Sequence, residues 1–286
     1  MIPSRASRFA LALLLAGLLP ALARCESAAD YRQQALAALM KKETTKALAL
    51  AGKAIAADPK DARGYLVRGT IHEASHKHTE AVADFSKCLE LDPRIAIAYN
   101  RRGAEQFKLG HVKESLADFD RFLELEPKAA PSHWMRGISL YYVGRFDDGR
   151  KQFKAGDQVF ANDVENAVWH FLCNVHVVGI DKARAAILKI GKDTRVPMME
   201  VYDLYRGKAK PADVLTAAEA GEVPAELRKE QLFYAHLYLG LYYDATGDKQ
   251  KALKHMALAE GKYRIGHYMG DVAHVHAELL RKELKK

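Results

Sequence analysis

Apolar and polar residues alternate along most of the chain with the spacing of an α-helix. Within residues 164–190, for example, Val168, Phe171, Leu172 and Val175 recur at intervals of three and four positions. That spacing places them on one face of a helix. Glycine and proline interrupt such stretches at short intervals, which is typical of turns. The pattern therefore predicts an all-α chain of short helices.

Three residue types repeat with a spacing of 34 positions. The three sets are Pro59, Pro93 and Pro127; Gly69, Gly103 and Gly137; and Phe85, Phe119 and Phe153. Several types that keep one phase indicate an internal repeat, which divides this part of the chain into four units. The predicted units are residues 28–61, 62–95, 96–129 and 130–163, within a region that spans 24–163.

Each unit is expected to form a hairpin of two antiparallel helices. The glycine lets the two helices approach closely because it has no Cβ. The phenylalanine fills the space between them, and the proline ends the second helix because it lacks an N–H. Such a hairpin leaves an apolar face that only a neighbouring hairpin can cover, so the units must stack.

The repeat is less regular after residue 163. We expect degenerate helical repeats over 164–225 and a final unit within 226–286, where Leu239 and Gly240 restore the pattern. The last residues, 267–286, are predicted to form a capping helix. Its inner side would carry the apolar residues Val272, Val275 and Leu279.

The period and its signature residues resemble those of the tetratricopeptide repeat (TPR). The fold class that this implies is an all-α superhelical solenoid of antiparallel helix hairpins with a C-terminal capping helix. Two segments, RGISLYYVGR at 136–145 and LGLYY at 239–243, are also similar to repeats of NlpI-like bacterial envelope lipoproteins. That resemblance implies a homodimeric adaptor that docks a periplasmic protease and cell-wall hydrolases.

The N-terminal segment has the pattern of a secretory signal peptide over residues 1–23. A short basic start precedes an apolar core at 9–19, and Ala21-Leu22-Ala23 forms a cleavage site. The core is too short for a transmembrane helix. We expect an exported protein, periplasmic or secreted. It would be anchored to the membrane only if Cys25 is lipidated, although Arg24 replaces the small residue that lipidation sites prefer.

The first helix of each hairpin lines the concave side of a stacked solenoid. In this register the candidate partner-binding residues are Arg63, Asn100, Arg101, Lys108, Trp134, Tyr141, Tyr142 and Tyr238. Polar side chains among them can bind a peptide carboxylate, and aromatic ones can act as anchors. For the tyrosines, a place in the core is the alternative. We therefore expect a scaffold or adaptor that binds a protein or peptide, without catalysis or cofactor.

Composition supports a folded protein: 49% of the 286 residues are hydrophobic and 28% are charged. The formal net charge is +8, but no nucleic-acid-binding motif accompanies it, and we expect no nucleic-acid partner. No stretch after residue 25 is apolar enough to span a bilayer. Cys88 and Cys173 lie about four helices apart in this register, so we expect no disulfide between them.

One motif suggests a different function. His72-Glu73-Ala74-Ser75-His76 matches H-E-x-x-H, in which two histidines on one helix face bind zinc and the glutamate activates water. The repeat register places His76 at the hairpin turn, which disfavours that geometry, so we assign no metal site. A zinc-dependent hydrolase and a purely structural oligomer, its concave face filled by its own chain, are the alternative hypotheses.

Overall fold

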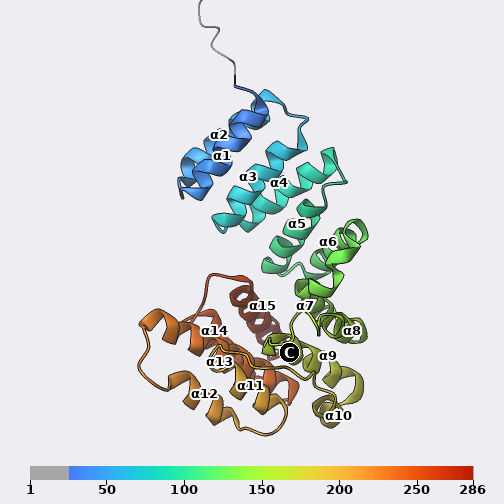
Figure 1. Cartoon of the computed structure of the whole chain (residues 1–286), viewed down its shortest axis with the longest axis vertical. Helices are drawn as coiled ribbons and strands as arrows, with labels where there is room; N and C mark the ends of the chain where they lie inside the picture. Colours follow the sequence, from blue (N-terminus) through green and yellow to red (C-terminus); the bar gives the residue numbers. More distant parts are fainter. Residues whose placement is uncertain (1–25, 286) are drawn as a thin grey trace, which may run out of the picture.

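The structure, a computed structural model, describes residues 26–285 (Figure 1). Within that range every regular element is helical. The predicted signal peptide at 1–23 and the candidate lipidation site Cys25 lie outside the described residues. None of the described helices is both long and apolar enough to cross a bilayer.

The first three hairpins follow the predicted period. They are α1 (Ala28–Met40) with α2 (Thr44–Ala57), α3 (Ala62–Ala74) with α4 (His78–Leu91), and α5 (Ala96–Lys108) with α6 (Val112–Leu125). Equivalent helices begin 34 residues apart, and each hairpin packs on the next (Figure 1). This arrangement confirms the predicted all-α solenoid of antiparallel helix hairpins.

The hairpin turns share a left-handed residue at one repeat position. It is Lys42, His76, Gly110 and Gly144 in successive hairpins, with φ between 55° and 80°. Glycine adopts this conformation without a steric penalty, which explains two of the four residues. The turn lets the second helix begin after only three residues.

The fourth hairpin departs from the period at its start. A 3-10 helix, η1 (Pro127–Ser132), precedes α7 (Trp134–Tyr142), whereas α8 (Phe146–Ala155) begins in phase. Pro131 lies within η1. Its ring locks φ and removes an N–H donor, and it restricts the residue before it. The first helix of this unit consequently begins four residues later than the repeat predicts.

The C-terminal half contains shorter and less regular helices before a final hairpin. They are α9 (Val164–Val178), α10 (Ile180–Ala185), α11 (Met198–Tyr205), α12 (Pro211–Glu219), α13 (Ala225–Ala245), α14 (Lys249–Glu260) and α15 (Tyr268–Glu283). The largest hydrophobic cluster joins these helices to α5, α7 and α8.

The repeated glycines lie directly against the repeated aromatic residues. A Cβ added to Gly69 would come within 2.7 Å of the Phe85 ring, and one added to Gly137 within 2.6 Å of the Phe153 ring. Real Cβ atoms do not approach so closely, so only glycine fits. The close approach of the two helices, expected from the sequence, is confirmed.

Helix α15 does more than cap the last hairpin. It packs on α14 and also returns to the third and fourth hairpins (Figure 1). The Tyr268 ring stacks on Phe107 of α5 at 5.0 Å and meets Trp134 of α7 edge-on at 5.2 Å. Leu279, expected on the inner side, is 37% exposed because α15 presents its other faces to these neighbours.

Candidate functional site

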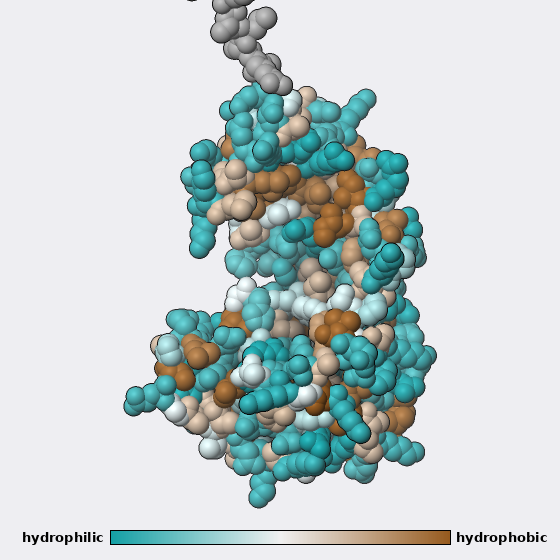
Figure 2. Space-filling model, in the orientation of Figure 1, coloured by the Kyte–Doolittle hydropathy of each residue, from teal (hydrophilic) through white to brown (hydrophobic). Residues whose placement is uncertain are grey.

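The first two hairpins form an open groove with an apolar floor. It has a volume of about 560 Å³. Its lining residues come from α1, α3 and the turn before α5: Ala29, Arg32, Gln33, Leu36, Arg63, Leu66, Val67 and Ile95. Figure 2 shows hydrophobic side chains gathered over this upper half of the molecule, framed by hydrophilic ones.

Large side chains in this region are exposed to solvent. Leu36 is 41% exposed, and Ile97, at the start of α5, is 42% exposed. Arg32 forms an ion pair with Asp61, the N-cap of α3, whereas the Arg63 side chain is exposed at the edge of the groove. Contiguous apolar surface with a polar rim is typical of a protein-binding site. We call these lining residues the N-terminal groove.

The polar candidates on α5 are held by neighbouring side chains. Arg101 donates to Glu73 of α3 at 2.5 Å, and Lys108 donates to the buried Glu105 at 2.5 Å. These ion pairs fix both cations within the chain. Arg63 is thus the basic candidate that remains exposed at the N-terminal groove.

Asn100 is bonded to the following hairpin. Its side-chain oxygen lies 2.9 Å from Nε2 of His133, whose Nδ1 accepts the backbone N–H of Arg136. The proton of a neutral His133 therefore lies on Nε2, which donates to Asn100. Burial lowers the pKa of His133 to about 4, so the ring is neutral at pH 7. Asn100 consequently helps to join α5 to the N-terminus of α7.

The aromatic candidates lie in the interior or beneath α15. Tyr238 is fully buried and donates to Glu165 at 2.5 Å, and Tyr141 is 7% exposed. Trp134 packs against Tyr268, and the Tyr142 hydroxyl lies 3.1 Å from Nδ1 of His276 on α15. The expectation of an open groove at these positions is therefore corrected: the chain's own last helix covers this part of the concave face.

Sequence reasoning missed the apolar floor, although the repeat register could have found it. Leu66 and Val67 stand one period before Asn100 and Arg101, at the same concave positions. Only the polar residues at these positions were predicted to bind a partner, because they can form specific hydrogen bonds. The apolar residues Leu66 and Val67 follow when the same register is applied to every unit.

The family model of the tetratricopeptide repeat matches residues 62–95, which form the second hairpin. Three neighbouring hairpins keep the same turns and the same glycine-to-aromatic contacts. The chain therefore has the fold of a tetratricopeptide repeat solenoid. No curated protein matches its sequence significantly.

Several solved structures share this TPR fold. A tetratricopeptide repeat protein from Parabacteroides merdae ATCC 43184 aligns with a TM-score of 0.56 at 15% identity, over 89% of this chain and 98% of its own. YrrB, described as a TPR protein with an unusual peptide-binding site, aligns at 0.54 and 20% identity over 68% and 93%. MamA aligns at 0.52 and 17% identity over 69% and 98%. Identities this low show the shared fold alone.

The H-E-x-x-H motif does not place its two histidines on one helix face. His76 follows the end of α3 in a left-handed turn, so it does not share a helix face with His72. Glu73 is paired with Arg101. Within residues 26–285, no three histidine, cysteine or acidic side chains are grouped so that they could hold a metal ion.

Both cysteines in the described range are buried and free, as the register predicted. Burial raises the pKa of the Cys88 thiol to about 11 and that of Cys173 further. A thiol must ionise to act as a nucleophile or metal ligand. These residues consequently serve as small apolar side chains of the TPR core.

Proposed function

We propose that this TPR protein is a non-catalytic scaffold that binds an extended segment of a partner protein in its N-terminal groove. The observation that carries the proposal is the apolar floor formed by Leu36, Leu66 and Ile95, in which Leu36 is 41% exposed. The adjoining concave surface of the third and fourth hairpins is occupied by α15. A partner can therefore reach the concave side at the first hairpins. The fold shared with YrrB, described as binding peptides, adds support.

The chemistry of the groove indicates the kind of segment that it binds. Its floor accepts apolar side chains, and their burial would provide most of the affinity. The exposed Arg63 guanidinium at its edge can pair with a carboxylate through charge-assisted hydrogen bonds. We expect an extended apolar segment that carries an acidic residue or a free C-terminus.

Charge substitutions in the groove are expected to abolish most peptide binding. Peptides would first be selected from a displayed library against the purified protein, and their affinities measured by calorimetry. Leu36→Glu and Leu66→Glu should each weaken binding by about tenfold or more, because a carboxylate would have to be buried against the peptide. Both side chains line the groove, and neither is fully buried in the core.

Leu227→Glu provides a matched control. Leu227 is 44% exposed, close to the 41% of Leu36, and lies in the first turn of α13, where an acidic residue is tolerated. This variant should bind the selected peptides like the original protein. Equal affinities for the two groove variants and this control would contradict the proposal.

We further propose that the protein is exported and acts as an adaptor in the bacterial envelope. The basic start, apolar core and Ala21-Leu22-Ala23 site support export. The mature chain isolated from a bacterial envelope fraction is expected to begin at Arg24, which intact-mass spectrometry would show. A mass that retains residues 1–23 would contradict export by cleavage, and an added acyl mass at Cys25 would indicate a lipid anchor.

A further inference from the structure

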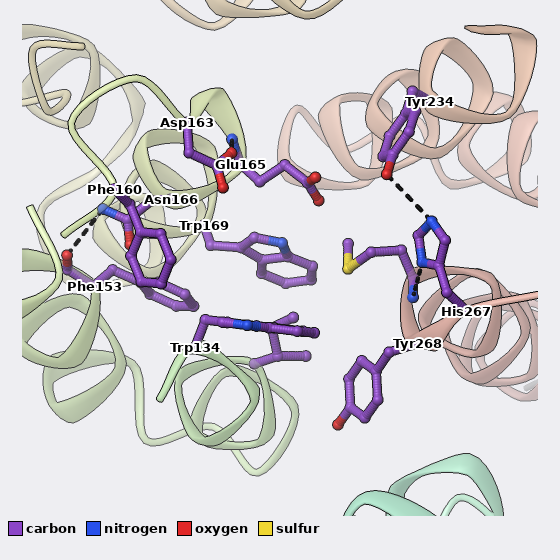
Figure 3. Close-up of a pocket in the computed structure, with 12 residues that line it drawn as sticks. Trp134, Phe153, Phe160, Asp163, Glu165, Asn166, Trp169, Tyr234, His267 and Tyr268 are labelled. Carbon is purple, nitrogen blue, oxygen red and sulfur yellow. Dashed lines mark hydrogen bonds between the residues drawn. The ribbon is translucent and has the colours of Figure 1, made fainter. Parts of the chain in front are cut away.

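A second cavity lies between the fourth hairpin, α9, and the helices α13 and α15 (Figure 3). Its volume is about 280 Å³, which suits one side chain or a small organic molecule rather than a drug-sized ligand. Half of its lining residues are the aromatic residues Trp134, Phe153, Phe160, Trp169, Tyr234 and Tyr268. The cavity is distinct from the N-terminal groove.

Two carboxylates also line this cavity, and the charge around them is unbalanced. Asp163 and Glu165 both form ion pairs with Arg195, at 2.8 and 2.5 Å. Arg195 is shared with a third carboxylate, Asp193, at 2.6 Å. One guanidinium thus faces three carboxylates in this cluster. Burial, and then the charge of Asp163, raises the pKa of Glu165, so a further cation beside it would be stabilising.

Trp169 provides an independent indication of a ligand. Its side chain is 2% exposed, and its indole N–H has no hydrogen-bond partner among the described residues. A buried donor without a partner costs about 1–3 kcal/mol. In Figure 3 the Trp169 ring and the Glu165 side chain both extend into the cavity, toward the side formed by Tyr234 and His267. An acceptor in the cavity would satisfy this donor.

We propose that the cavity binds an organic cation, an ammonium or guanidinium group, whose adjoining carbonyl or hydroxyl oxygen accepts from Trp169. The cation would lie beside Glu165 and Asp163 and against the aromatic faces, which attract positive charge. One aromatic residue of the wall already contacts such a group: the Arg195 guanidinium lies over the Tyr234 ring at 5.6 Å. The ligand can be an arginine or lysine side chain of a protein or a free amine.

Tryptophan fluorescence reports binding directly, because Trp134 and Trp169 are the two tryptophans of the chain and both line the cavity. The probes are a capped Gly-Arg-Gly peptide, the same peptide with neutral citrulline in place of arginine, and argininamide, a free amine that carries a carbonyl oxygen. The arginine peptide or argininamide should change the fluorescence in a saturable way, and the citrulline peptide should bind at least about tenfold more weakly than the arginine peptide. Tighter binding of the peptide assigns a protein ligand; tighter binding of argininamide assigns a free amine.

Substitution of the carboxylates separates charge from packing. Glu165→Gln and Asp163→Asn should each weaken binding of whichever cation binds more tightly by about tenfold. Asparagine is itself a good N-cap, so Asp163→Asn preserves the start of α9 and keeps the test valid if Glu165→Gln does not fold. Glu219→Gln, at the exposed end of α12, is the control variant and should bind the cation with unchanged affinity. No saturable response to either cation, or equal affinity for arginine and citrulline, would overturn the proposal.

Discussion

Replacing Tyr268 by alanine is expected to lower the free energy of unfolding by about 3 kcal/mol, the lower end of the range for large aromatic residues, because the ring is partly buried against the core. The ring stacks on Phe107 and meets Trp134 edge-on, so it joins the last helix to the third and fourth hairpins. Its loss would leave a cavity between parts of the chain that otherwise have few contacts. Urea denaturation followed by circular dichroism would measure the change.

Leu279→Ala on the same helix is the matched control. Leu279 is 37% exposed, and its truncation should cost less than about 1 kcal/mol, since little apolar surface is lost from the interior. If both substitutions have similarly small effects, α15 does not pack against the concave face in solution. The open groove would then extend further along the solenoid than we propose.

Two glycine-to-alanine substitutions are expected to change stability in opposite directions. Gly137→Ala should destabilise the protein by about 2–3 kcal/mol, because its Cβ would lie 2.6 Å from Phe153, whose ring is buried and cannot move aside. Gly52→Ala should stabilise it by about 0.5–1 kcal/mol, because alanine favours a helix interior. Gly52 lies within α2 with no atom within 4 Å of its added Cβ.

The same urea titrations measure the free energy of unfolding of both variants. The difference between the two values cancels the effects that any glycine-to-alanine change has in a helix. A difference of about 3 kcal/mol is expected. If Gly137→Ala stabilises the protein as much as Gly52→Ala does, the two helices of the fourth hairpin are not held together by the contact that the repeat predicts.

The fold could be predicted where the physical reason for a residue is local. A glycine facing an aromatic ring and a proline after the second helix recur at fixed positions, and the helices of the first three hairpins begin in that phase. The later start of α7 follows from Pro131, a single residue that does not belong to the repeating pattern. The shared left-handed turn is visible in sequence as Gly110 and Gly144.

The site could be predicted only in part, because it depends on contacts between distant segments. Repeat register placed Trp134 and Tyr142 on the concave side, but no local pattern showed that α15 would cover them. Tyr238 belongs to α13 and is fully buried among the less regular helices, so it takes the core position that the sequence left open as the alternative. The apolar residue Leu66 of the open groove follows from the same register once apolar positions are considered, whereas Leu36 stands at a different repeat position.

The central claim, that a partner segment lies along the first hairpins, is tested most directly by mapping its contacts. A selected peptide with a photoreactive group would be crosslinked to the protein, and the modified residues identified by mass spectrometry. We predict crosslinks on α1, α3 and the start of α5, near Leu36, Leu66 and Ile95. Crosslinks confined to α2, α4 and α6, or to α13–α15, would contradict the proposed binding site.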